Sequence, residues 1–248
     1  FMETSAELKE LHLNAFKGFK QQVLPIGETT ILIGRNSSGK SNALDALETL
    51  SRLATGDTIS DALDAPRRDG EAIRGGSEGL APHGKNSFSL GCKVSMDEWD
   101  HIYTIEIEVG AESGPRIIRE ELKGPGLARE SGDFGGLKVL FSTREPEENT
   151  GSIEAEYHNG KRGSNPHERF ADNRLVLKQF IDRYQYSDDL GIRSAVQGAH
   201  AVRVALLAVF HLDPVPYLMR DYVRERPATM YRTGQNISAV LKFLKDKN

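Results

Sequence analysis

The chain has 248 residues, enough for one large domain or two small ones, and its hydrophobic content of 38% is ordinary for a soluble globular protein. The formal net charge of −4 excludes a protein that attracts nucleic acid over its whole surface, although a local basic patch remains compatible with it. Cys92 is the only cysteine, which excludes a disulfide framework and a cysteine-ligated metal cluster and favours a reducing, cytoplasmic location. No apolar run approaches the length of a membrane span, so we expect no membrane association.

Two short strands are expected near the start of the chain. Residues 8–13 carry leucines in an imperfect alternation, residues 21–26 form a second run, and Gly18 marks the turn between the two. A third strand is expected at residues 29–33, because this β-branched and aliphatic run is typical of a buried strand. An amphipathic helix is predicted over residues 41–53, where four leucines at helical spacing form one apolar stripe: Leu44, Leu47, Leu50 and Leu53.

The third strand and this helix are joined by a glycine-rich loop. Its sequence is a full match to the pattern G-x-x-x-x-G-K-[ST] of a phosphate-binding P-loop (Walker A motif), in the strand–loop–helix order that the motif requires. A chance match to the bare pattern is the alternative, and the predicted strand and helix on either side argue against it. We therefore predict that nucleotide phosphates bind to Gly34, Arg35, Asn36, Ser37, Ser38, Gly39, Lys40, Ser41 and Asn42.

Each residue type in the loop has a physical role in binding phosphate. Gly34 and Gly39 permit backbone angles that other residues avoid, and the amides of the loop and helix start gather partial positive charge. Lys40 adds a full charge for the β- and γ-phosphates, and the hydroxyl of Ser41 is the expected ligand of Mg²⁺. ATP and Mg²⁺ are therefore the expected cofactors, and the sequence identifies no catalytic residue.

Residues 56–85 differ in composition from the rest of the chain, with six glycines, two prolines and a cluster of charges. We expect this segment to be a mobile surface loop inserted into the domain. The alternative is a segment that faces DNA or a partner through Arg67, Arg68 and Arg74, although the interleaved acidic residues weaken this idea.

Residues 86–159 alternate between apolar and polar side chains with a period of two, which predicts an antiparallel sheet exposed on one face. In one of these runs Ile118, Glu120 and Leu122 are expected on the same side. Glu106 and Glu108 fall on the polar side of their strand, where we interpret them as solvated residues and not as a catalytic pair. The expected strands lie at 88–94, 103–109, 118–122, 137–141 and 153–157.

From Pro166 onward the apolar spacing becomes helical. We expect a helix ending near Tyr184, another at 192–207, and a final helix with Asn236 as its N-cap. The apolar segment 204–210 could instead form a core strand.

The turn Phe16-Lys17-Gly18-Phe19 and the loop Gly-x-Asn-x-x-Gly-Lys-Ser at 34–41 together resemble the N-terminal ATPase segment of the SMC, RecF and OLD-like branch of ABC-type ATPases. The resemblance covers residues 8–53, and beyond them it is one of architecture. It implies an α/β P-loop NTPase fold, the N-terminal part of an ABC/SMC-like head, with an antiparallel β subdomain and a C-terminal helical region. The expected domains are an ATPase lobe at 1–165 and a mainly helical region at 166–248.

An ABC-type site also requires an aliphatic strand that ends in Asp-Glu and a signature segment of the Leu-Ser-x-Gly type. Neither is found in residues 1–248, and in the resembled family both lie further toward the C-terminus, so we expect this chain to be the N-terminal portion of a longer ATPase. The alternative is that Asp213 holds Mg²⁺, but Pro214 stands where the catalytic glutamate would be.

The resemblance implies an ATPase whose heads are clamped together by ATP, as a homodimer or with a partner ATPase half, acting on DNA in repair, maintenance or defence against phage. The alternative is a regulatory or assembly module that controls a partner effector such as a nuclease without touching DNA. A P-loop kinase or GTPase is a third option, against which the long antiparallel insert argues. The seven histidines show no metal-ligand spacing, and Tyr184 and Tyr186 beside Arg183 could either stack on a base or serve in packing.

Overall fold

The computed structural model describes residues 6–66, 72–111, 113–127, 134–146, 150–161, 163–212, 214–220 and 230–247. The chain forms two compact units. The larger unit holds its described residues up to Ala65 and Ile73–Ala208, and the smaller holds those from 209 onward together with the short stretch 66–72. The division therefore falls after residue 208, and not near 165 as the sequence suggests, because the helices after residue 165 pack against the sheet.

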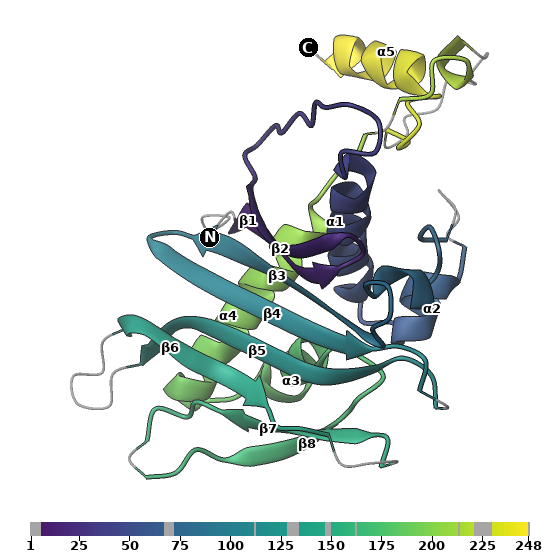
Figure 1. Ribbon diagram of the computed structural model, residues 1–248. Coiled ribbons are helices and arrows are strands. Elements are labelled where there is room, and N and C mark those ends of the chain that lie inside the picture. The colour runs from purple at the N-terminus through teal and green to yellow at the C-terminus, as the bar shows by residue number, and fades with distance from the viewer. Residues whose placement is uncertain are drawn as a thin grey trace. The chain divides into compact units, whose positions relative to one another are not determined.

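The larger unit is built on one antiparallel sheet, which the described residues form with eight strands in the order β2-β1-β3-β4-β5-β6-β7-β8 (Figure 1). From β3 onward each strand pairs with the next along the chain, which confirms the meander that the alternating pattern predicts. The strands are β1 (Ala6–Phe16), β2 (Phe19–Pro25), β3 (Ser87–Met96), β4 (Trp99–Glu108), β5 (Arg116–Leu127), β6 (Phe134–Thr143), β7 (Ser152–Tyr157) and β8 (His167–Ala171).

Helices cover one face of this sheet. The long helix α4 (Leu190–Leu207) crosses behind the strands, and α1 (Lys40–Leu53) lies against β1 and β3 (Figure 1). In β3 and β4 alternate residues point toward the helices and are buried, while most of their neighbours stay half-exposed, as the period of two requires. Large buried strand residues include Leu11, Leu13, Phe16, Phe88, Leu90, Tyr103, Ile105, Ile107 and Phe141.

The strand expected at residues 29–33 is not formed. The segment has no strand pairing, and the side chains of Ile31 and Ile33 are 76% and 90% exposed. An aliphatic run becomes a buried strand only where another strand lies beside it to complete its hydrogen bonds. Among the described residues no strand flanks this segment, so the sequence-based expectation of a buried strand is wrong here.

The expectation of a loop at residues 56–85 also requires correction. Helix α2 (Ile59–Asp64) begins at Thr58, whose hydroxyl accepts a hydrogen bond from the amide of Asp61 at 3.1 Å. Ile59 and Leu63 are fully buried, and so is Leu80 in the short helix η1 (Glu78–Leu80). A few apolar residues thus anchor a segment whose overall composition is that of a loop, and Arg67 and Arg68 lie outside the described residues.

The region after Pro166 begins with strand β8, although the apolar spacing from Pro166 onward predicts a helix there. Helix α3 (Val176–Tyr184) follows, and helix α4 settles the choice left open for residues 204–207 in favour of a helix. Tyr184 packs in the core, with its ring 4.8 Å from that of Phe180, so the packing alternative holds for this tyrosine. In the smaller unit η2 (Leu218–Arg220) precedes α5 (Ile237–Lys247), which begins directly after Asn236 as expected.

A bulge in β5 changes the expected pattern of one strand. Its register against β4 shifts between Glu106 and Ile107, so that Ile117, and not Ile118, points into the core. Glu120 nevertheless points inward and is completely buried. Glu106 and Glu108 lie on the half-exposed side, where Glu108 pairs with Arg116 at 2.7 Å.

Candidate nucleotide-binding site

The glycine-rich loop leads directly into α1. Gly39 adopts the left-handed conformation with φ = 93°, and a β-carbon there would lie 3.0 Å from the ring of Phe19, so glycine suits both the angle and the space. Within the described residues no side chain caps the start of α1, and its first turn has no acidic residue. The amides and the positive end of the helix dipole are therefore available to an anion.

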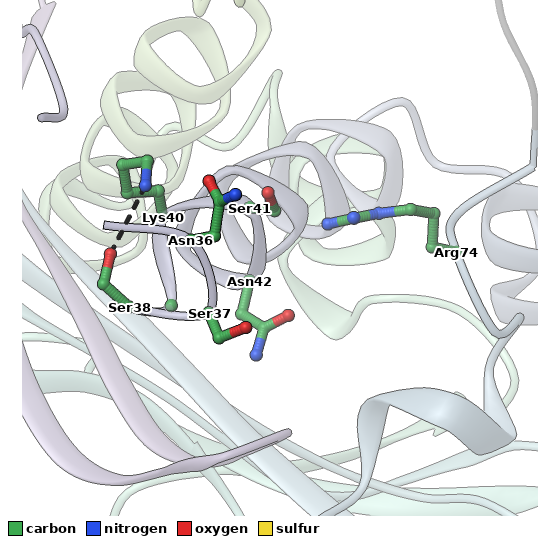
Figure 2. A pocket seen from close by; sticks show the side chains of 8 residues that line it. Asn36, Ser37, Ser38, Lys40, Ser41, Asn42 and Arg74 are labelled. Atoms are coloured by element: carbon green, nitrogen blue, oxygen red, sulfur yellow. Dashed lines mark hydrogen bonds between the residues drawn. The ribbon is translucent and has the colours of Figure 1, made fainter. Parts of the chain in front are cut away.

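The side chain of Lys40 folds back over the loop. Its Nζ donates hydrogen bonds to the carbonyl oxygens of Gly34 at 2.6 Å and Arg35 at 2.8 Å, and it lies 3.4 Å from Oγ of Ser38 (Figure 2). These contacts fix the ammonium at the mouth of the loop. The same donors suit the oxygens of a phosphate, which carry more negative charge than carbonyl oxygens.

A cavity of about 520 Å³ opens beside the loop. Seven of the nine residues predicted from the sequence line it, while Gly34 and Arg35 contribute their carbonyl oxygens to Lys40. One further lining residue, Arg74, comes from the segment between α2 and η1, and Figure 2 shows it on the side of the cavity away from Lys40. The lining residues are Asn36, Ser37, Ser38, Gly39, Lys40, Ser41, Asn42 and Arg74.

Arg74 belongs to an ion cluster below the loop, which we call the Asp45 cluster and define as Asp45, Lys17 and Arg74. The carboxylate of Asp45 is buried on α1 and accepts hydrogen bonds from Nζ of Lys17 and Nη2 of Arg74, each at 2.7 Å. Lys17 stands in the turn between β1 and β2, in a left-handed conformation with φ = 47°. The cluster therefore ties the first hairpin and the segment before η1 to the helix that starts at the loop.

Sequence reasoning missed Asp45 and Lys17 as site residues and considered Arg74 only for DNA or a partner. Asp45 is part of the polar side of a helix, and nothing local distinguishes it from a solvated residue. Its position four residues after Ser41 was the available signal, since residues at this spacing share one face of a helix.

The donor set fits a magnesium-bound triphosphate. The cavity has the size of common small-molecule sites, which span about 300 to 1,000 Å³, and its lining offers an ammonium, a guanidinium, hydroxyls and amides. Ser41 would hold Mg²⁺ through its hydroxyl, and Lys40 with the loop amides would hold phosphate oxygens. None of the described residues that line the cavity is acidic, so no carboxylate from this lining stands ready to activate water.

Other candidate chemistry is not supported by the described part of the chain. There, no three His, Cys, Asp or Glu side chains come together in a way that could hold a metal ion. Burial raises the pKa of the Cys92 thiol to about 12, so this cysteine stays protonated. Asp213, the alternative Mg²⁺ ligand, lies outside the described residues. None of the described helices has the length and apolar character needed to cross a bilayer.

Short segments of several RecF proteins are similar to this chain. The "DNA replication and repair protein RecF" of Rippkaea orientalis is 44% identical over 55 residues, and that of Trichodesmium erythraeum is 47% identical over 55 residues. Each match covers 22% of this chain and 14% of the relative, so the similarity spans only a small part of the RecF length.

One solved structure is described as "Structure of the recombination mediator protein RecF-ATP in RecFOR pathway". Its match covers 53% of this chain and 29% of the chain in that structure, with 22% sequence identity and a TM-score of 0.32. This likeness is too weak to carry an argument about function.

The family comparison covers most of the chain. A family model described as "AAA domain, putative AbiEii toxin, Type IV TA system" matches residues 29–225, a range that begins just before the glycine-rich loop and includes the cavity. The geometry of the loop and the cavity beside it are those expected of a P-loop ATPase, and the family match includes both. The chain belongs to this AAA-domain family of P-loop ATPases, in the SMC/RecF-like branch of ABC-type ATPases.

Proposed function

We propose that this chain binds Mg·ATP through residues 34–42 and serves as the ATPase module of a RecF-like protein that acts on DNA in repair, maintenance or anti-phage defence. The observation that carries the proposal is the convergence of seven loop residues on one cavity, with the ammonium of Lys40 at the loop mouth. The similarity to short segments of RecF proteins supports the link to DNA, since the names of those relatives state DNA replication and repair.

On this proposal, nucleotide binding exchanges hydrogen bonds within the loop for hydrogen bonds to phosphate. Lys40 gives up the carbonyl oxygens of Gly34 and Arg35 and donates to phosphate oxygens, which are stronger acceptors. The amides at the start of α1 add partial positive charge at the same point, and the hydroxyl of Ser41 orients Mg²⁺. A Mg²⁺ held by Ser41 would supply charge neutralisation at the phosphates.

We further propose that ATP brings two such heads together, as a homodimer or with a partner ATPase half, in a cytoplasmic protein. A second candidate is a regulatory module that binds nucleotide and controls an effector such as a nuclease without contact to DNA. The formal net charge of −4 favours this second candidate modestly, because it provides no general attraction to nucleic acid.

Calorimetric titration of ATP into the protein tests the nucleotide proposal. Lys40→Ala should abolish binding, because the loop amides alone cannot offset the phosphate charge, whereas Lys123→Ala, which removes a lysine paired with Glu121 on the sheet, should leave it unchanged. Equal affinity of the Lys40→Ala protein and the parent would rule the P-loop site out. Co-elution with duplex DNA in the presence of ATP then separates the two candidates, since only the first expects a complex.

A further inference from the structure

Strand β8 forms one border of the sheet (Figure 1). On one side it pairs with β7, and among the residues that the structure describes no strand pairs with it on the other side. An unpaired strand edge presents a row of backbone N–H and C=O groups, which can pair with a strand of another chain. The partners of these groups therefore determine whether this sheet can add a further strand.

The backbone groups at the outer edge can be assigned from the hydrogen bonds on the inner side. In an antiparallel strand the N–H and C=O of one residue point to the same side, and successive residues alternate. The carbonyl oxygen of Pro166 accepts from the amide of Tyr157, and the amide of Asp172 donates to the carbonyl oxygen of Gly151. The even-numbered residues of this stretch therefore face β7, and the outer edge is formed by residues 167, 169 and 171.

The side chain of Gln179 on α3 takes the place of a strand beside Ala171. Its Oε1 accepts a hydrogen bond from the amide of Ala171 at 2.9 Å, and its Nε2 donates to the carbonyl oxygen of the same residue at 2.8 Å. A residue on an adjacent antiparallel strand would make this same pair of bonds. Because a primary amide has both a donor and an acceptor, Gln179 occupies both edge groups of Ala171.

Arg183 covers the next outward position along the edge. Its Nη1 donates a hydrogen bond to the carbonyl oxygen of Arg169 at 3.2 Å and pairs with the carboxylate of Glu168 at 2.8 Å. Its guanidinium also lies over the ring of Phe170, with Cζ 4.7 Å from the ring centroid. Contacts with three successive residues of β8 therefore hold this side chain against the strand.

The spacing of the two side chains on α3 matches the spacing of the two positions that they cover. Gln179 and Arg183 are four residues apart on a helix, which is about 6 Å along its axis. Ala171 and Arg169 are two residues apart on a strand, which is about 6.8 Å. One face of α3 can therefore serve successive outward positions of β8. The end of the helix at Tyr184 limits this cover to two positions.

We propose that Gln179 and Arg183 close the outer edge of the sheet against strand addition, and that the covered edge is a latent pairing surface for β8 of a second copy of this chain. A second β8 is the occupant that the geometry favours. A twofold axis at Arg169 would place residues 167, 169 and 171 opposite 171, 169 and 167 of the second copy, so that every outward position is paired at once. Arg169 is a further barrier, because it would lie opposite the same charge.

Amide hydrogen exchange tests the closure of the edge. In Gln179→Ala the amide of Ala171 loses its acceptor and should exchange about tenfold faster, the effect of one lost hydrogen bond. The amide of Phe170 faces β7 and should keep its rate. Gln185→Ala, which truncates an exposed glutamine at the end of the same helix, should change neither amide. An unchanged rate at Ala171, or an equal acceleration at Phe170, would overturn the role of Gln179.

Disulfide trapping tests the pairing surface. Burial raises the pKa of the Cys92 thiol to about 12, so Arg169→Cys supplies the reactive thiol and also removes the like charge. The substitution is made with the two α3 side chains intact and in a Gln179→Ala/Arg183→Ala background. Both proteins are oxidised with copper phenanthroline in the absence of nucleotide, so that association driven by ATP does not contribute. At the twofold axis the two α-carbons would lie about 5.5 Å apart, within the range that a disulfide spans.

A disulfide-linked dimer should form in the protein without the two α3 side chains and not in the protein that retains them. Equal trapping in both would overturn the closure, and trapping in neither would overturn the pairing surface. Leu63→Ala combined with Arg169→Cys is the control for lost stability, because Leu63 is buried on α2, away from β8 in the sequence. This control should give no linked dimer. Trapping there to the same extent would show that unfolding, and not an open edge, brings the thiols together.

Discussion

The carboxylate of Glu120 on β5 accepts a hydrogen bond from the backbone amide of Leu177 at the start of α3, at 2.7 Å. Its second oxygen accepts from the amide of Val176 at 2.7 Å, and the hydroxyl of Tyr103 donates to the first at 2.8 Å. The N-cap residue of α3, Leu175, has no side chain that can serve these amides. Glu120 therefore caps α3 from the sheet and fixes where the helix begins on it.

The burial of this carboxyl group predicts an unusual dependence of stability on pH. Burial raises the pKa of Glu120 to about 7, despite the opposing effect of its three hydrogen-bond donors. Because the folded pKa lies above the unfolded value, the stability that Glu120 contributes is fully present below about pH 4.5 and is lost as the pH rises through 7. The loss should reach roughly 3 kcal/mol.

Urea unfolding of the parent and Glu120→Gln between pH 4.5 and 8 measures this effect. The difference in free energy of unfolding between the two proteins should shrink as the pH rises, while Glu121→Gln, on the half-exposed side of β5, should show a constant difference. Burial lowers the pKa of His101, which acts in the opposite sense, but this histidine is common to all three proteins and cancels in the differences. Parallel curves for parent and Glu120→Gln would contradict the prediction.

Ser41→Ala should affect nucleotide binding only when Mg²⁺ is present. The hydroxyl is expected to bind the metal and not the phosphate, so its loss should weaken Mg·ATP about tenfold, the effect of one lost polar contact. Affinity for ATP in the presence of a chelator should change little. Calorimetric titration with and without Mg²⁺ makes the comparison, with Ser89→Ala on the sheet as control. Equal losses in both conditions would show that Ser41 does not serve the metal.

Residues 1–248 alone should bind ATP but hydrolyse it near the background rate. Hydrolysis requires a positioned water and charge stabilisation on the γ-phosphate, and the described residues lining the cavity include no carboxylate to orient water. Losing a group of this kind costs about 10³ to 10⁵ in rate. A phosphate-release assay on the purified chain checks this. Turnover near 1 s⁻¹, a rate typical of enzymes, that disappears in Lys40→Ala would make Asp213 the first catalytic candidate.

Helix α2 should behave as part of the core and not as a mobile loop. Leu63 is completely buried, so Leu63→Ala should lower the free energy of unfolding by about 2 to 5 kcal/mol. Leu137→Ala, which truncates a half-exposed leucine on β6, should change it by less than about 0.5 kcal/mol. Hydrogen exchange should show protected amides in residues 59–64. Fast exchange throughout these residues would instead support the mobile loop that the composition predicts.

Features that have a local cause can be predicted from the sequence alone. The spacing from Gly34 to Ser41 predicts a phosphate-binding loop, because each residue type is required at its own position by backbone angle or charge. The alternation from residue 88 to 157 identifies the antiparallel strands, because successive side chains of a strand point to opposite faces. Such rules depend only on neighbours along the chain and remain valid wherever the segment lies in the fold.

Features that depend on distant partners follow from the packing of the folded unit and could not be predicted from the sequence. Arg74 reaches the cavity because Asp45, 29 residues earlier, holds its guanidinium, and Glu120 finds its donors on a helix 56 residues later. The run at 29–33 has the composition of a strand but pairs with no strand among the described residues. The residue type and the sequence around it indicate which groups a side chain can bind. The packing of the whole unit determines which partner comes within hydrogen-bond distance. The neighbours of a residue along the chain do not indicate that partner.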